Sequence, residues 1–382
     1  MFVLSMENVG IGKLLKPLNE KPKPKIILVV ISNFPQYEVL TPILVALQRH
    51  SNIRPTVLLS RKLLRRNHTI LTTLKNAGID TRIKSVLGYE LLLTRILFRT
   101  SAFLTLTDPI LHNKKKKPKD LLCRLFNIPT ILIQHGALQF GFNWPVQNGA
   151  QVSFAAQLIL TWENVQNYEH SWLPKEVRER CKAFGFPKDR LCPPRAFDDE
   201  FRQFLKGFDR KVLICTNYNE TFRFTPSDIQ RGRNIIKELV LKYPKTLFIY
   251  RTHRARNTEN GADFFRLLAE KNSNFIISDR WTGPMRYSEI VDVLAEVDAC
   301  ISHASTAVLD SVFQSVPTAV LQNQWPRFSS LAQIEDLNSA ESFLESHEEP
   351  QAQMAKISEI YGEFPENSNR AAKYISDFIS KK

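Results

Sequence analysis

The chain has 382 residues, of which 43% are hydrophobic and 24% are charged, and its formal net charge is +14. This length allows two domains, each able to bury its own core, and the composition excludes a disordered or fibrous protein. No run of eighteen or more uncharged apolar residues occurs, and the N-terminal segment lacks the order of charged, apolar and cleavage regions typical of a signal peptide. We therefore expect a cytoplasmic protein.

The basic residues are unevenly distributed. Residues 1–140 hold 22 Lys and Arg against 7 Asp and Glu, a net +15, whereas the remainder holds 30 against 31, a net −1. Such asymmetry predicts an anionic partner, either a membrane surface, an anionic glycolipid or a nucleic acid, although a solvated surface that only aids solubility is the alternative. Two clusters are the expected contact surface: Arg61, Lys62, Arg65 and Arg66, and Lys114, Lys115, Lys116 and Lys117.

The five cysteines are scattered along the chain, and no two of them are separated by two residues. Two of the five, Cys215 and Cys300, lie inside apolar runs. This pattern favours reduced, buried thiols over a zinc site, so we expect no bound metal.

The N-terminal half predicts a flexible basic arm followed by alternating strands and helices. Residues 1–24 are polar and rich in Lys and Pro. Short apolar runs rich in β-branched residues predict the strands, and apolar residues at helical spacing predict the helices. The expected strands are 25–34, 55–60, 102–108, 128–134, 156–162 and 181–186, and the expected helices are 37–49 and 61–76.

A polar connector at 195–209 separates this series from a second one. The second series has strands at 210–217, 245–253, 274–279, 298–302 and 317–322, with helices at 227–243, 262–271, 288–296, 305–315 and 366–380. Continuously apolar strands that alternate with helices predict parallel sheets covered on both faces.

We therefore expect an α/β fold of two Rossmann-like parallel-sheet domains that face each other across a cleft. Residues 25–195 would form an N-terminal acceptor domain and residues 210–365 a C-terminal nucleotide-donor domain. The terminal helix, within 366–382, would return to the N-terminal domain. Ligands of such sheets bind outside the carboxyl ends of the strands, so the cleft is the expected site.

Three of the eight histidines, His135, His253 and His303, follow directly after predicted strands. Each one taken singly is more typical of a structural residue, but three such residues spread over both domains favour a shared cleft. The segment after residue 302 adds Ser305 and Thr306 at the start of a predicted helix. A Ser or Thr there caps the helix, and a helix start at a sheet edge also suits a phosphate.

The stretch EIVDVLAEVDACISHASTAVLDSVFQSVPTAVLQ resembles the nucleotide-binding region of GT-B glycosyltransferases, closest to the CDP-glycerol glycerophosphotransferase and capsule-polysaccharide transferase group. Ser305 and Thr306 match the serine pair of that group, and Asp310 matches its acidic position. His303 stands where an Asp is often found, which leaves the subfamily open.

Three further segments resemble the same group, in the same order along the chain. ILIQHGAL carries a His-Gly turn at His135 and Gly136, and FGFPKDRL matches a Gly-x-Pro element at Gly185 and Pro187. YRTHR matches an Arg-x-His-Pro segment except that Arg254 replaces the proline. The resemblance covers about residues 128–322.

The resemblance implies a metal-independent transfer from a nucleotide-activated donor to an acceptor hydroxyl in bacterial surface polysaccharide or glycolipid synthesis. The net +15 of the first domain fits a peripheral place on the inner membrane and an anionic lipid-linked or glycan acceptor that faces this domain. We expect no nucleic-acid partner, because no nucleic-acid-binding motif occurs, and no cofactor. The expected catalytic residues are His135 as general base, His253 and Asp310, the last accepting from ribose or a histidine. The expected donor-phosphate contacts are Arg251, His303, Ser305, Thr306, Asn217, Asn219 and Thr221, and the expected acceptor-side residues are Gln134 and Gly136.

Three alternatives stay open at this stage. Residues Asn217 to Thr221 are equally typical of a plain turn. A nucleotide-sugar 2-epimerase has the same architecture but needs several carboxylates around the sugar, and the acidic residues near strand ends are few: Asp108, Asp279 and Asp310. A basic nucleic-acid binder or a non-catalytic member of the group are the remaining possibilities.

Overall fold

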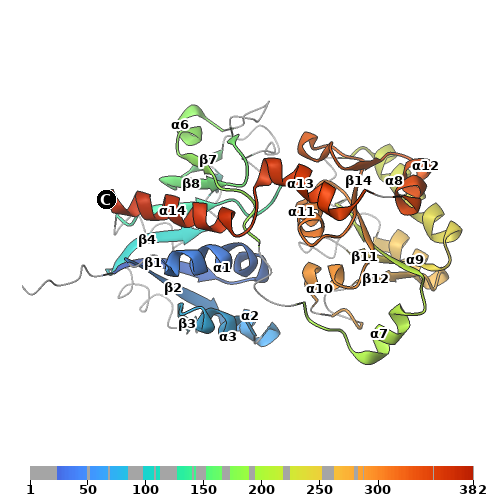
Figure 1. Cartoon of the computed structure of the whole chain (residues 1–382), viewed down its shortest axis with the longest axis horizontal. Coiled ribbons are helices and arrows are strands. Elements are labelled where there is room, and N and C mark those ends of the chain that lie inside the picture. The colour runs from blue at the N-terminus through green and yellow to red at the C-terminus, as the bar shows by residue number, and fades with distance from the viewer. Residues whose placement is uncertain are drawn as a thin grey trace, which may run out of the picture.

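A computed structural model describes residues 24–49, 52–67, 69–84, 98–106, 109–111, 127–139, 142, 152–165, 173–188, 194–217, 224–251, 262–278, 283–286, 288–346 and 348–381. Within these ranges the chain forms two lobes, each a twisted parallel sheet with helices packed on it (Figure 1). The predicted fold class of two parallel-sheet α/β domains is confirmed. No described helix has the length and apolarity that a membrane crossing requires.

The N-terminal lobe contains a seven-stranded sheet in the order β3-β2-β1-β4-β6-β8-β9. Its strands are β1 (Lys25–Ile31), β2 (Ile53–Ser60), β3 (Asp80–Lys84), β4 (Thr100–Thr105), β6 (Thr130–Ile133), β8 (Leu158–Thr161) and β9 (Cys181–Ala183). Every pairing in it is parallel. Its helices are α1 (Phe34–Gln48), α2 (Arg61–Arg66), α3 (Thr69–Asn76) and α6 (Lys175–Arg178), and β5 (Pro109–Leu111) pairs separately with β7 (Val152–Phe154).

The C-terminal lobe contains a six-stranded parallel sheet in the order β12-β11-β10-β13-β14-β15. Its strands are β10 (Arg210–Cys215), β11 (Thr246–Arg251), β12 (Phe275–Ile277), β13 (Ala299–Ser302), β14 (Thr318–Leu321) and β15 (Ala332–Ile334). Its helices are α7 (Asp199–Leu205), α8 (Pro226–Lys242), α9 (Ala262–Lys271), α10 (Ile290–Leu294), α11 (Thr306–Val312), α12 (Leu337–Glu345) and α13 (Pro350–Tyr361), with a 3₁₀ turn η5 (Pro326–Phe328).

Two predicted segments differ from the structure. The single helix expected at 61–76 is divided into α2 and α3 because the Asn67 side chain accepts a hydrogen bond from the Thr69 backbone N–H, which starts a new helix. The polar connector at 195–209 contains α7, because Asp198 caps a helix by accepting from the Phe201 N–H.

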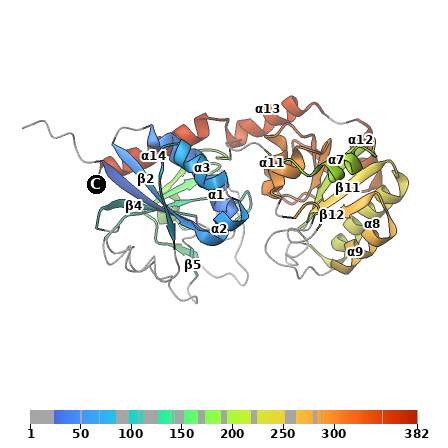
Figure 2. The same cartoon turned by 90° about the horizontal axis from the view of Figure 1, so that it is seen from below.

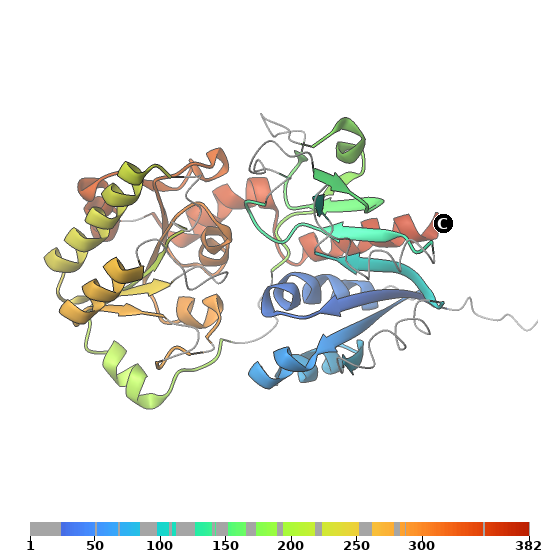
Figure 3. The same ribbon diagram turned by 180° about the vertical axis from the view of Figure 1, so that it is seen from behind.

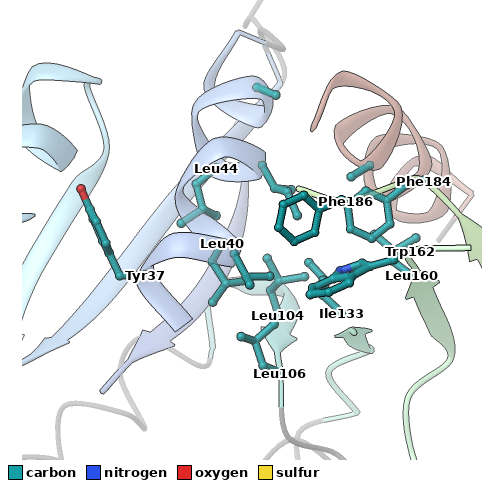
Figure 4. Packing of buried hydrophobic residues seen from close by; sticks show 14 of the residues in the cluster. Tyr37, Leu40, Leu44, Leu104, Leu106, Ile133, Leu160, Trp162, Phe184 and Phe186 are labelled. Atoms are coloured by element: carbon teal, nitrogen blue, oxygen red, sulfur yellow. The ribbon is translucent and has the colours of Figure 1, made fainter. Parts of the chain in front are cut away.

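The last helix, α14 (Glu366–Ser380), packs on α1 of the N-terminal lobe. The helix before it, α13, packs on α11 within the C-terminal lobe (Figures 1 and 2). Seen from behind, the two helices follow each other across the seam between the lobes (Figure 3). One continuous hydrophobic cluster therefore joins α1, α11, α13 and α14. Part of it, around Leu40, Leu44, Trp162 and Phe186, is drawn in Figure 4. A second cluster fills the C-terminal lobe.

The Asn367 side chain forms hydrogen bonds with both segments in which the chain crosses between the lobes. Its side chain is fully buried, and Nδ2 donates to the carbonyl oxygens of Phe186 at 3.0 Å and Tyr361 at 2.8 Å. Gly185 and Gly362 flank it with φ of +103° and +68°, and a Cβ on either would lie 2.2 Å from Asn367 Oδ1. Both glycines are therefore required by backbone conformation and by space.

Gly185→Ala is expected to destabilise the protein by about 3 kcal/mol or more, because it combines a positive φ with a steric clash at a crossing point. Gly283→Ala is the matched control, since Gly283 also has a positive φ of +71° but no atom lies within 4 Å of the added Cβ. The control should cost only about 1–2 kcal/mol. Thermal unfolding measures both, and an equal loss in melting temperature would contradict this role of Asn367.

Candidate functional site

The strand order of each sheet reverses at one point, which is where ligands of open α/β sheets bind. In the C-terminal lobe the chain leaves β10 toward β11 and leaves β13 toward β14, so the reversal lies between β10 and β13. In the N-terminal lobe the corresponding reversal lies between β1 and β4. The residues that follow these four strands are therefore the first candidates for a site.

The carboxyl ends of the two sheets meet at the start of α11. The Ala137 N–H, which lies four residues past β6, donates to Thr306 Oγ1 at 3.0 Å. Ser305 is the N-cap of α11, and its hydroxyl accepts from the Ala307 N–H at 3.2 Å. The capping role expected of this pair is thus present at Ser305, while Thr306 joins the C-terminal lobe to the turn that carries His135.

His303 lies inside the C-terminal lobe and holds the strand ends together. It is 1% exposed, its ring is stacked on Phe224, and its Nδ1 accepts from the Asn217 N–H at 2.9 Å. The backbone N–H of His303 donates to the Cys215 carbonyl oxygen. These bonds tie the end of β10 to the end of β13, so His303 fixes the backbone of the reversal point instead of presenting its ring to the cleft.

Gln134 shapes the turn that carries His135 and Gly136. It is fully buried, its Nε2 donates to the Gly136 carbonyl at 2.8 Å, and its Oε1 accepts from the Trp162 N–H at 2.8 Å. The His135 N–H donates to Gln139 Oε1 at 3.0 Å. These three hydrogen bonds hold the turn in place, and the Gln134 side chain does so from inside the lobe.

The His135 side chain is exposed to solvent at the end of β6. The surrounding protein desolvates the ring and lowers its pKa, an effect partly opposed by a hydrogen bond with the Leu106 backbone. Because the ring also contacts water, solvent screens part of this desolvation. The imidazole is consequently neutral at neutral pH, the form that can accept a proton.

Asp310 and Arg251 both have protein partners. The Asp310 carboxylate accepts from Lys188 Nζ at 2.8 and 2.9 Å, and its contact with ribose or a histidine stays a prediction. Arg251 is buried, and its guanidinium donates to Ser278 Oγ at 3.0 Å and to the Ser288 carbonyl at 2.8 Å. These bonds anchor the segments after β12 and before α10 to the end of β11.

Several expected site residues lie outside the described ranges: His253, Asn219, Thr221, Lys114, Lys115, Lys116 and Lys117. Of the other basic cluster, Arg61, Lys62 and Arg65 are exposed on α2, while the side chain of Arg66 is not described. Their expected roles stay predictions.

Sequence reasoning missed the charged pairs that join the lobes. Arg327, in η5, pairs with Glu163, which lies two residues after the end of β8. Arg327 Nε is 3.0 Å from Glu163 Oε2, and the Glu163 side chain is 2% exposed. Lys188, in the segment after β9, pairs with Asp310 of α11 and lies 3.5 Å from Glu38 of α1. The only sequence signal was indirect, because Lys188 belongs to the FGFPKDRL segment already singled out at the end of the first lobe.

No protein-family model and no curated protein sequence matches the chain. Solved structures share its fold across most of its length. S. aureus MnaA with UDP has a TM-score of 0.57 and 12% identity over 93% of this chain and 96% of that one. A putative UDP-N-acetylglucosamine 2-epimerase from Listeria monocytogenes has a TM-score of 0.58 and 11% identity, with coverages of 92% and 95%. Arabidopsis thaliana UGT89C1 complexed with UDP has a TM-score of 0.54 and 12% identity, with coverages of 93% and 99%.

These likenesses establish the GT-B fold, the arrangement of two facing Rossmann-like lobes that the sequence predicted. At 11–12% identity they show the fold alone, and they do not single out the CDP-glycerol transferase group.

His135 should make stability depend on pH in the acidic range. Its pKa is lower in the folded chain than the ordinary value of about 6.5, so below that pH the unfolded chain binds more protons and stability falls. His135→Gln removes this contribution. Thermal unfolding between about pH 7.5 and pH 5.5 should therefore show a smaller loss of melting temperature in the variant than in the wild type. An equal or larger loss in the variant would contradict the lowered pKa.

Proposed function

We propose that this chain is a GT-B transferase that binds a nucleotide-activated donor in the cleft between its lobes. It would move a glycosyl or glycerophosphoryl-type group to an acceptor hydroxyl in bacterial surface polysaccharide or glycolipid synthesis. The observation that carries the proposal is the meeting of the α11 start with the His135 turn. The start of α11 suits a phosphate, and the turn presents a neutral imidazole.

On the donor side, the proposal assigns the leaving phosphate to the start of α11. The first-turn N–H groups and the hydroxyls of Ser305 and Thr306 would stabilise the charge that develops on the departing nucleotide. Asn217, at the neighbouring end of β10, would contribute its side chain, because its backbone N–H already donates to His303 Nδ1. Arg251 and His303 act indirectly in this proposal, because their bonds position the strand ends. His253, Asn219 and Thr221 remain predicted donor contacts.

On the acceptor side, His135 would take the proton of the attacking hydroxyl. The acceptor oxygen then forms a bond to the transferred group as the bond to the nucleotide phosphate oxygen breaks, and the phosphate leaves with its electron pair. The proton remains on the imidazole until it passes to solvent, which the exposed ring contacts. Gln134 and Gly136 serve this step by holding the turn in place.

A nucleotide-sugar 2-epimerase is the second candidate, because proteins described as UDP-N-acetylglucosamine 2-epimerases share this fold. Epimerisation needs carboxylates or other acids and bases around the sugar ring. Asp310 is neutralised by Lys188, and Glu163 is paired with Arg327 away from solvent. Asp108 and Asp279 lie outside the described ranges. The pairing of Asp310 is what favours transfer over epimerisation.

NMR of UDP-N-acetylglucosamine incubated with the protein and no acceptor separates the two candidates. A transferase leaves the C2 configuration unchanged and at most hydrolyses the donor slowly, because it lacks the second acid or base that inversion at C2 requires. Appearance of the C2 epimer at a rate that depends on enzyme concentration would overturn the transferase proposal. The His135→Gln variant is the control for activity carried by contaminants.

The exposed basic residues of α2 support contact with an anionic membrane surface or acceptor, at the inner membrane. Arg61, Lys62 and Arg65 present three positive charges on one short helix. Sedimentation with vesicles of anionic phospholipid tests this part of the proposal, which fails if charge reversal of these three residues leaves binding unchanged.

Thermal shift with UDP, CDP, CMP, GDP and ADP tests the donor site. One nucleotide class should raise the melting temperature, since a ligand at a hundred times its dissociation constant adds about 2.7 kcal/mol to stability. The double variant Ser305→Ala/Thr306→Ala should lose that shift because it removes two hydroxyls at the proposed phosphate site.

Asp336→Ala is the matched control for this experiment. It also removes a helix cap of the C-terminal lobe, at the start of α12, so it lowers stability without touching the proposed site. A nucleotide shift that survives in the double variant, or that is lost equally in the control, would contradict the assignment.

A further inference from the structure

A cavity of about 350 Å³ lies at the seam between the lobes, apart from the turn that carries His135. Its walls come from α1 of the N-terminal lobe, from α10, α11 and α13, and from the segments that cross between the lobes. Most of its lining is apolar, with five aromatic rings: Phe34, Tyr37, Phe186, Phe313 and Phe364. This volume lies at the lower end of the range for small-molecule pockets, about 300–1,000 Å³.

Negative charges outnumber positive charges among the described residues that line the cavity. Its charged lining residues in the described part of the chain are Glu38, Lys188 and Asp310. Lys188 Nζ lies 2.8 Å from Asp310 Oδ1 and 3.5 Å from Glu38 Oε2, and the three side chains are only 13%, 6% and 10% exposed. The Lys188 ammonium therefore faces two carboxylates. It donates hydrogen bonds to both oxygens of the closer one, Asp310.

Two buried oxygen atoms on the same face of α1 have no hydrogen-bond partner among the described residues. They are Glu38 Oε1 and Thr41 Oγ1, three positions apart on the helix. Thr41 is 1% exposed. Buried oxygens of this kind are normally paired, and an unpaired carboxylate oxygen is costly to keep out of water. Glu38 and Thr41 both line the cavity, so a ligand placed there can pair with these oxygens once the side chains turn toward it.

We infer that this cavity binds a small organic cation with a primary ammonium group and an aromatic or other apolar body. The ammonium would donate to Glu38 Oε1 and Thr41 Oγ1 and bring the net charge of the described lining residues from −1 to zero. The body would pack among the aromatic rings, whose faces also attract cations. A phosphate or carboxylate is disfavoured here, since it would add a second unbalanced negative charge in an apolar setting.

The site differs from the proposed nucleotide site in chemistry and in position. Nucleotides are anions, and the start of α11 offers N–H donors, whereas the cavity borders the other end of α11 at Phe313, Gln314 and Ser315. Because α1 belongs to one lobe and α11 to the other, an occupied cavity stabilises the present arrangement of the lobes. The inference is independent of which reaction the cleft performs.

Three phenyl compounds of similar size that differ in the charge of the head group test the inference on the wild-type chain. Phenethylamine should bind with a dissociation constant in the millimolar range or lower, as measured by isothermal titration calorimetry or ligand-observed NMR. The neutral 2-phenylethanol should bind more weakly, and 3-phenylpropanoate should not bind. Absence of phenethylamine binding, or equal binding of all three compounds, would overturn the inference.

Variants then locate the binding. Glu38→Gln keeps the shape of the side chain but removes its charge, and should weaken phenethylamine binding about tenfold or more. Thr41→Val removes the second acceptor and should weaken it less, so it serves if Glu38→Gln fails to fold. Glu359→Gln makes the same charge change on the exposed face of α13 and should leave binding unchanged. Equal affinity in wild type, Glu38→Gln and Thr41→Val would overturn the assignment to this cavity.

Discussion

The contact between the start of α11 and the turn after β6 is the constraint on which the site depends. A single hydrogen bond, from the Ala137 N–H to Thr306 Oγ1, joins residues 169 positions apart in the chain. It brings the carboxyl ends of two separate parallel sheets together. It can form only because each partner is held by its own lobe, Ala137 through the braced Gln134 turn and Thr306 through the Ser305 cap.

Buried charge pairs fix how the lobes sit relative to each other. The pairs Arg327–Glu163 and Lys188–Asp310 cross the seam, while Glu38 of α1 approaches Lys188 from the N-terminal lobe. Buried ion pairs add little net stability compared with apolar packing, but breaking one is costly because the remaining charge is stranded. These pairs fix the relative position of the lobes, because a shift of one lobe would leave the buried charges unpaired. The shared hydrophobic cluster around α1, α11 and α14 supplies the non-specific part of the attachment.

The sequence predicted the fold well wherever one element carries its own signal. The helices at 262–271 and 366–380 agree with α9 and α14 at both ends, because their apolar residues recur at helical spacing. It failed at β3, whose sequence DTRIK is charged and becomes a strand only through pairing with β2. It also failed at 61–76, where one asparagine side chain divides a helix.

The site was harder to predict than the fold for a related reason. The Ser305 cap is a local pattern and was recognised. The partner of Asp310 lies 122 positions away, so no spacing rule could identify Lys188. His303 has the sequence position of a cleft residue, but its ring is buried because the backbone of Asn217 needs an acceptor there. A polar residue after a strand can therefore serve the backbone as readily as a ligand.

A crystal structure of the chain with the nucleotide that stabilises it would show where the phosphate binds. We expect the phosphate oxygens to lie within hydrogen-bonding distance of Ser305 and Thr306, in front of the ends of β10 and β13 and facing His135. A nucleotide bound away from the start of α11, with the His135 turn unoccupied, would contradict it.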